Sequence, residues 1–153
     1  MPLKEKTGIR DLGYSLWHRK SLPRSATTTD IDHVEYCPDC FEPLAIFEIA
    51  YGLNNLDKEH AYSIPAIKRL AARARLNFYI VLYEGEHEGA SQCPTCGRPF
   101  PRSRIVAFRK KLVYPGENHW VEMSVDDYRE WLMSLHVEHR KYCYARKNGK
   151  GDL

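Results

Sequence analysis

Residues 28–50, with the sequence TTDIDHVEYCPDCFEPLAIFEIA, decide the fold predicted for this chain. The stretch Asp30–Tyr36 alternates side chains between two faces, which predicts a β-strand. The stretch Leu44–Ala50 is almost continuously apolar, as a strand covered on both faces would be. Between them, Cys37–Cys40 lie where a hairpin turn would join two neighbouring strands.

Carboxylates lie at the start of the first predicted strand and near the end of the second. Glu48 stands inside an apolar run, where burial of an unpaired charge would be costly. A metal ion would compensate that charge. The alternative is an edge-facing Glu48 that pairs with an arginine, and local spacing leaves both interpretations open.

Length and composition indicate one domain with a real core, because the chain has 153 residues, 43% hydrophobic and 28% charged. The net charge of +3 permits nucleic-acid binding without requiring it. The longest apolar stretches are too short to span a bilayer, and the first residues lack the apolar core of a signal peptide. We therefore expect a cytoplasmic protein with no membrane partner.

Two CPxC motifs carry the most specific pattern in the sequence. A CxxC turn presents two thiolates to one ion, and structural zinc takes four such ligands in a tetrahedron. Without a secretion signal, four of five cysteines in paired motifs favour a metal over disulfides. A redox dithiol is the alternative. The predicted ligands of one structural zinc ion are Cys37, Cys40, Cys93 and Cys96.

A further group near the C-terminus has helical spacing. It consists of His136, His139 and Cys143, which suggest another metal site. A solvated helix end is the simpler interpretation, and we expect that one.

A strand–helix–strand unit is predicted after the first hairpin. Ser63 as N-cap and Pro65 in the first turn predict a helix over 63–76, with an apolar face that includes Ile67. The β-branched and aromatic stretch Asn77–Tyr83 predicts the next strand, so that the unit forms a right-handed βαβ crossover.

The remainder predicts a turn, a strand and a helix. The acidic segment Glu84–Ala90 reads as a turn, and Arg104–Tyr114 as a strand with a wet face. Ser124 and Asp127 resemble a capping box that opens a helix. Its apolar stripe contains Trp131, and residues 145–153 are expected to form a flexible tail.

Basic residues gather before the first strand and along the strand over 104–114. Cations beside aromatic side chains can hold nucleic-acid phosphates, although a solvated loop is the plain alternative for the first group. The predicted phosphate-binding residues are His18, Arg19, Lys20, Arg24, Arg104, Arg109, Lys110 and Lys111.

Thr29–Tyr36 followed by Pro43–Ile49 resembles the core of the PD-(D/E)XK nuclease superfamily, as found in small phage-type and Holliday-junction-resolvase-like members. The resemblance covers residues 17–84. It implies an α/β fold with a restriction-endonuclease-like mixed sheet flanked by helices. To this fold the chain adds a pair of zinc knuckles at 37–40 and 93–96, in a single nuclease-like domain over 1–153.

The resemblance implies a hydrolase that cuts DNA phosphodiester bonds with Mg²⁺ or Mn²⁺, with selectivity for branched structures. Its metal ligands would be Asp32, or Asp30, and Glu48. The family places a lysine two residues after the glutamate, where this chain has Ala50. Lys68 on the following helix is the candidate replacement.

Loss of that lysine is equally consistent with a catalytically inactive, zinc-stapled module that binds nucleic acid or protein. If the chain is instead an active nuclease, its expected partner is DNA. A second copy of the chain would be needed for symmetric cutting of a junction, because that reaction requires a dimer. A host or other partner protein is the remaining alternative.

Overall fold

The computed structural model describes residues 20–21, 31–55, 62–92, 97, 99–116 and 119–143. The chain divides into two compact units, residues 1–29 with 86–104 and residues 30–85 with 105–153. A single domain over 1–153 stays a prediction. No helix in the described ranges is long and apolar enough to cross a membrane.

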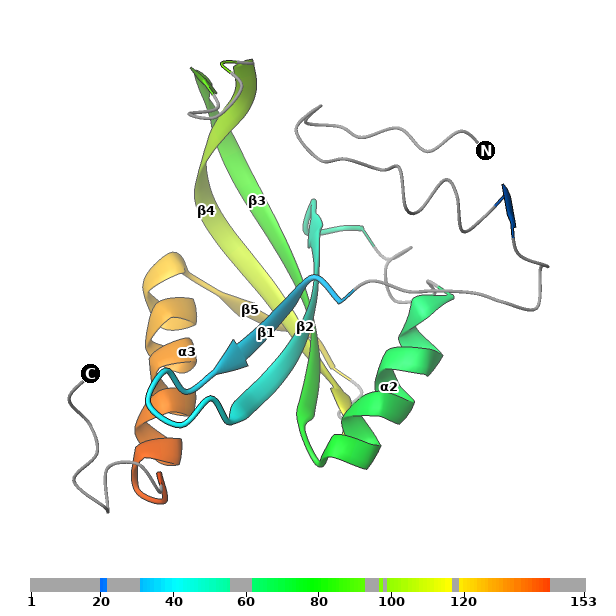
Figure 1. Ribbon diagram of the computed structural model, residues 1–153. Helices are drawn as coiled ribbons and strands as arrows, with labels where there is room; N and C mark the ends of the chain where they lie inside the picture. The colour runs from blue at the N-terminus through cyan, green and yellow to red at the C-terminus, as the bar shows by residue number, and fades with distance from the viewer. Residues whose placement is uncertain are drawn as a thin grey trace. The chain divides into compact units, whose positions relative to one another are not determined.

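Five strands form one mixed sheet in the order β1-β2-β3-β4-β5 (Figure 1). Their bounds are β1 His33–Tyr36, β2 Pro43–Tyr51, β3 Asn77–Gln92, β4 Pro99–Tyr114 and β5 Val121–Met123. β1 is antiparallel to β2, β2 is parallel to β3, and β4 is antiparallel to β5. The predicted hairpin and the mixed α/β class are therefore confirmed.

Helix α2 (Ser63–Ala74) connects the parallel strands β2 and β3, as predicted for a βαβ unit. Parallel neighbours need such a crossover. Ile67 of α2 is 1% exposed and belongs to the core cluster that contains Ile46 and Ile80. The prediction of Ser63 as N-cap is wrong, because Tyr62 occupies that position without a side-chain capping bond.

Helix α3 (Val125–Arg140) covers the opposite face of the sheet (Figure 1). Ser124 and Asp127 form the predicted capping box. The Trp131 ring lies 6.0 Å from the ring of Phe47 and 4.8 Å from that of Tyr79. The predicted packing of the helix stripe onto the sheet is thus confirmed.

The two sheet faces divide the side chains of β2 between the helices. Phe47 belongs to the core cluster that includes α3 residues, whereas Ile46 belongs to the cluster with α2, and Ala50 packs against it. Alternation along a strand places Glu48 on the α2 side, between Ile46 and Ala50. β2 reads as continuously apolar because a helix covers each of its faces.

The prediction of a turn over Glu84–Ala90 is wrong, because β3 continues through this segment to Gln92. Its acidic residues alternate, and Arg104 on β4 pairs with Glu86 at 2.6 Å and with Glu88 at 3.7 Å. A cation opposite two carboxylates offsets the unfavourable charge of an acidic strand. β4 begins at Pro99, earlier than predicted, and β5 was not predicted.

Candidate metal centre and acidic pair

Four potential metal ligands meet where the β1–β2 turn lies against the C-terminal end of α3. The ligand atoms of Cys37, Cys40, His139 and Cys143 all lie within 4.8 Å of one another. Cys37 and Cys143 are buried, and the other two are half-buried. This group could hold a structural metal such as zinc.

The turn that carries the first two thiols is closed by backbone hydrogen bonds. Cys37 N donates to Glu42 O at 2.8 Å, and Phe41 N donates to Cys37 O at 2.8 Å. Phe41 adopts a left-handed conformation with φ of 60°, which is uncommon for a bulky residue. Gly97 follows the second CPxC motif in the same way and also has a positive φ, 69°. A residue with a positive φ therefore follows each motif.

The other two ligands are His139, in the last turn of α3, and Cys143, which follows the end of the helix. Tyr142 N donates to His139 O at 2.9 Å, so the chain keeps turning as it leaves the helix. His139 and Cys143 are four residues apart, a spacing that places both side chains on one side of a helical turn. One turn earlier, His136 Nε2 lies 2.6 Å from Glu35 Oε1 and connects α3 to β1.

The observed separations fit tetrahedral zinc. With zinc–sulfur bonds of about 2.3 Å, two thiolates in a tetrahedron lie about 3.8 Å apart. Cys37 Sγ and Cys143 Sγ are 3.8 Å apart. A thiolate and an imidazole nitrogen around zinc are separated by about 3.6 Å, and Cys40 Sγ lies 3.2 Å from His139 Nε2. Two of the six separations among the four ligand atoms are thus close to those that an ion would impose, and all lie within 4.8 Å.

The electrostatics of the group also favour a cation. The pKa of the Cys40 thiol is raised to about 11: a backbone hydrogen bond from Glu42 lowers it, but burial and the thiols of Cys37 and Cys143 together outweigh that effect. The Cys40 thiol therefore keeps its proton in the absence of a metal, whereas a bound zinc ion would hold it as a thiolate. Cys37, Cys40 and Cys143 form no disulfide.

These findings revise the predicted environment of the first CPxC motif. Cys37 and Cys40 do lie in a metal-type cluster, but their observed neighbours are His139 and Cys143. The expectation of a solvated helix end is wrong, because Cys143 is 0% exposed. The spacing C-x2-C followed by H-x3-C was the sequence pattern that could have identified the group. Cys93 and Cys96 lie outside the described residues, so the four-cysteine site stays a prediction.

Of the two carboxylates predicted to bind a metal, alternation along β2 places Glu48 on the α2 side of the sheet. β1 pairs with β2 so that His33 is opposite Phe47, and Asp32 immediately precedes β1 and is exposed. Asp32 Oδ2 accepts a hydrogen bond from Ile49 N at 2.7 Å. Glu48 is only 5% exposed. Glu48 is therefore a buried residue, and the interpretation of an edge-facing glutamate is wrong.

The other predicted catalytic residues are less closely associated with this pair. Lys68 is exposed on α2, next to the buried Ile67. No ion pair or hydrogen bond joins Lys68 to either carboxylate within residues 31–55 and 62–85. Asp30 lies outside the described residues, as do His18, Arg19 and Arg24, and Lys20 is exposed.

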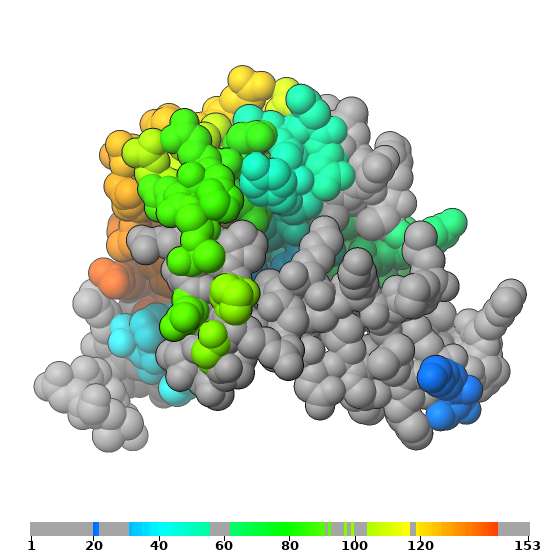
Figure 2. Space-filling view, turned by 90° about the horizontal axis from the view of Figure 1, so that it is seen from above, coloured from blue at the N-terminus to red at the C-terminus, as the bar shows by residue number. Residues whose placement is uncertain are grey.

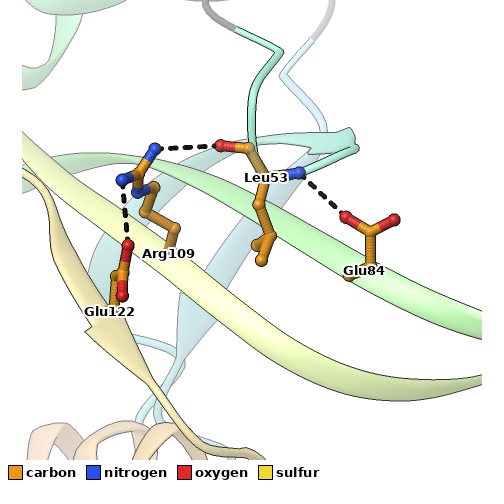
Figure 3. Close-up of polar contacts among 4 residues, drawn as sticks. All are labelled: Leu53, Glu84, Arg109 and Glu122. Carbon is orange, nitrogen blue, oxygen red and sulfur yellow. Dashed lines mark hydrogen bonds and ion pairs between the residues drawn. The ribbon is translucent and has the colours of Figure 1, made fainter.

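Arg109, predicted to bind phosphate, takes part in a polar network above the sheet (Figure 3). It donates to Glu122 Oε1 at 2.9 Å and to Leu53 O at 3.2 Å, while Leu53 N donates to Glu84 Oε2 at 3.3 Å. In Figure 2 the loop that follows β2 lies beside β3 at the surface, which agrees with the contact between Leu53 and Glu84. Arg109 therefore anchors this loop to the sheet.

The remaining predicted cations also have partners. Lys110 Nζ lies 3.8 Å from the ring centroid of Trp131, and Lys111 Nζ lies 5.9 Å from that of Trp120. Arg104 pairs with two carboxylates, as described above. These contacts give the four residues structural roles, and their binding to nucleic acid stays a prediction.

Comparisons with protein-family models, with curated proteins and with solved structures find no match to this chain.

Proposed function

We propose that the protein is a metal-dependent nuclease that hydrolyses DNA phosphodiester bonds, with Asp32 and Glu48 as the metal-binding carboxylates. The observation that supports this most is the position of Glu48, 5% exposed in an apolar strand and next to Ile49, whose backbone N–H donates to Asp32 Oδ2. Burial of a carboxylate costs several kcal/mol unless it is compensated. A divalent cation shared by the two carboxylates would contribute to that compensation.

The donor set fits Mg²⁺ or Mn²⁺. Both ions prefer oxygen ligands, and Mg²⁺ is commonly held by one or two carboxylates together with water and a substrate phosphate. The thiolates and imidazole of the cluster at Cys37 suit zinc instead. The chain thus offers two chemically distinct sites, one that stabilises structure and one that serves catalysis.

The protein's own residues would position the reacting groups. The hydrogen bond from Ile49 N fixes the orientation of the Asp32 carboxylate, and β2 holds Glu48 between two packed apolar residues. A cation bound there would polarise the scissile phosphate and lower the pKa of its bound water. Lys68 extends from the flank of α2 and would bring an ammonium group toward the phosphate, the part played in the resembling family by the lysine that Ala50 replaces here.

A second candidate function is a zinc-stapled module that binds nucleic acid or a partner protein without cutting it. Ala50 favours this alternative, because the lysine of the resembling motif is missing. Three predicted phosphate-binding residues already make contacts within the protein: Arg109, Lys110 and Lys111. These contacts favour neither candidate function over the other.

Nicking of supercoiled plasmid and cleavage of a panel of labelled linear, branched and single-stranded DNAs test the proposal. We expect cutting with Mg²⁺ or Mn²⁺ and none without them. Glu48→Gln should lower the rate by about 100-fold or more, since it removes charge stabilisation at the reacting centre. Glu130→Gln, an exposed carboxylate on α3, is the matched control and should cut normally.

Absence of metal-dependent cutting by the wild-type protein would refute the nuclease proposal. Unimpaired cutting by Glu48→Gln would refute the assignment of the site. Specific DNA binding by the wild-type protein without cutting would instead support the binding module.

A further inference from the structure

Helix α2 and its C-cap carry an unusual concentration of positive charge. The sequence from Ser63 to Arg75, SIPAIKRLAARAR, contains no acidic residue. Its four cations are Lys68, Arg69, Arg73 and Arg75, and all four are exposed. Because the whole chain has a net charge of only +3, the rest of the chain is slightly acidic. The four cations of this segment thus exceed the net charge of the whole chain.

Most of the other cations in the described part of the chain have a partner within the protein, although Lys20 and Arg140 form no ion pair with a described residue. Arg104, Arg109, Arg129 and Lys141 each form an ion pair with a carboxylate. No cation of α2 forms an ion pair with another described residue. Arg69 and Arg73 of α2 are also four positions apart, a spacing at which like charges destabilise a helix by a few tenths of a kcal/mol. A negatively charged ligand would remove this repulsion.

The helix also lies on the same side of the sheet as Glu48. Its buried residues Ile64 and Ile67 pack in one cluster with Ile46, which neighbours Glu48 on that face of β2. Lys68 lies on the flank of the helix, whereas Arg69 and Arg73 lie on its outer surface, opposite the buried residues. The helix that carries this outer surface therefore packs on the face of the sheet to which Glu48 belongs.

The spacing of the two outer arginines suits a nucleic-acid backbone. Four residues of α-helix rise about 6 Å, and each strand of a DNA duplex carries one phosphate about every 3.4 Å of axis. Arg69 and Arg73 can therefore reach phosphates that are neighbours or near neighbours along one strand. Arginine binds phosphate through a planar fork of donors and remains charged at every physiological pH.

We infer that the outer surface of α2, formed by Arg69 and Arg73, binds the phosphate backbone of duplex DNA without reading its sequence. This inference rests on the proposed nuclease function for the meaning of the neighbouring carboxylates. The binding itself can be measured without added divalent cations and hence separately from cleavage.

The test measures duplex binding by fluorescence anisotropy as a function of salt concentration, with a labelled DNA of arbitrary sequence. The variant Arg69→Gln/Arg73→Gln removes both charges, and glutamine keeps a helix propensity close to that of arginine. Each lost phosphate contact lowers the slope of log K against log salt by about 0.9. We therefore expect the slope to decrease by about 2. Circular dichroism confirms that the variant is folded.

The matched control is Arg129→Gln/Arg140→Gln, which removes the same charge from exposed positions on α3. This control should keep the wild-type slope. An unchanged slope in the α2 variant, or an equal decrease in the control, would overturn the inference. A wild-type protein that binds anionic vesicles but no duplex would also overturn it and indicate a membrane partner.

The outcomes separate this inference from the proposed function. Duplex binding that depends on α2 without metal-dependent cutting would support the inference and refute the nuclease. Metal-dependent cutting with no change of slope in the α2 variant would support the nuclease and refute the inference.

Discussion

Replacement of Cys143 by serine tests the metal centre most sharply. Cys143 Sγ is buried and lies 3.8 Å from Cys37 Sγ, the separation expected for two thiolates on one zinc ion. Structural zinc sites bind their ion with about 10–16 kcal/mol, so one of four ligands accounts for about 3 kcal/mol. We therefore expect Cys143→Ser to weaken zinc binding by more than 100-fold.

The assay determines the zinc content of freshly purified protein and then measures the affinity by competition with a chromogenic chelator. The free energy of unfolding should fall with the zinc affinity, because the ion connects the end of α3 to the β1–β2 turn. Replacement of zinc by cobalt gives a spectrum whose thiolate charge-transfer bands should report three sulfur ligands.

Cys93→Ser is the matched control, since Cys93 belongs only to the four-cysteine alternative. A centre made of Cys37, Cys40, His139 and Cys143 predicts that this variant keeps its zinc. If Cys93→Ser released the ion while Cys143→Ser retained it, the reasoning from the observed geometry would be refuted and the four-cysteine site supported.

Two further predictions concern pH and helix capping. Burial, and to a smaller extent the charge of Glu35, raises the pKa of Tyr128 to about 12. The folded state therefore favours the neutral phenol. The free energy of unfolding should fall by about 2 kcal/mol in all as pH rises from about 10 to 12. Urea unfolding at several pH values checks this, and Tyr128→Phe should remove that part of the decrease. Hydrogen bonds from the Ser124 side chain and then its backbone N–H lower the pKa of Asp127, so their contribution is present above about pH 4 and lost as pH falls further. Ser124→Ala should cost about 1 kcal/mol at neutral pH and should show a weaker loss of stability in acid, whereas an unchanged unfolding curve would contradict the capping role.

The local features of the fold were predictable from the sequence. The hairpin, the βαβ unit and the capping box at Ser124 each depend on a pattern within a few residues, such as the apolar run of β2 or the Ser124–Asp127 spacing. The continuation of β3 through Glu86 and Glu88 was missed because acidic residues are depleted in strands. Their compensation by Arg104 depends on the neighbouring strand and is not visible locally.

The metal centre was also only partly predictable, because its ligands come from segments that are far apart in the sequence. Cys40 and His139 are 99 positions apart, and the sequence does not show that the end of α3 lies against the β1–β2 turn. That placement depends on the packing of Trp131 onto β2 and β3 and on the contact between Glu35 and His136. The CPxC motif identified half of the ligand group, and tertiary packing determines the other half.

The claim that Asp32 and Glu48 share one divalent cation is the step on which the proposed function depends. Electron paramagnetic resonance of Mn²⁺ added to the zinc-loaded protein counts the ions bound and follows their displacement by Mg²⁺. We predict one competing site per chain in the wild-type protein and in the control Glu130→Gln, and its loss in both Asp32→Asn and Glu48→Gln. Absence of bound Mn²⁺ in the wild-type protein, or its retention in both of these variants, would contradict the claim.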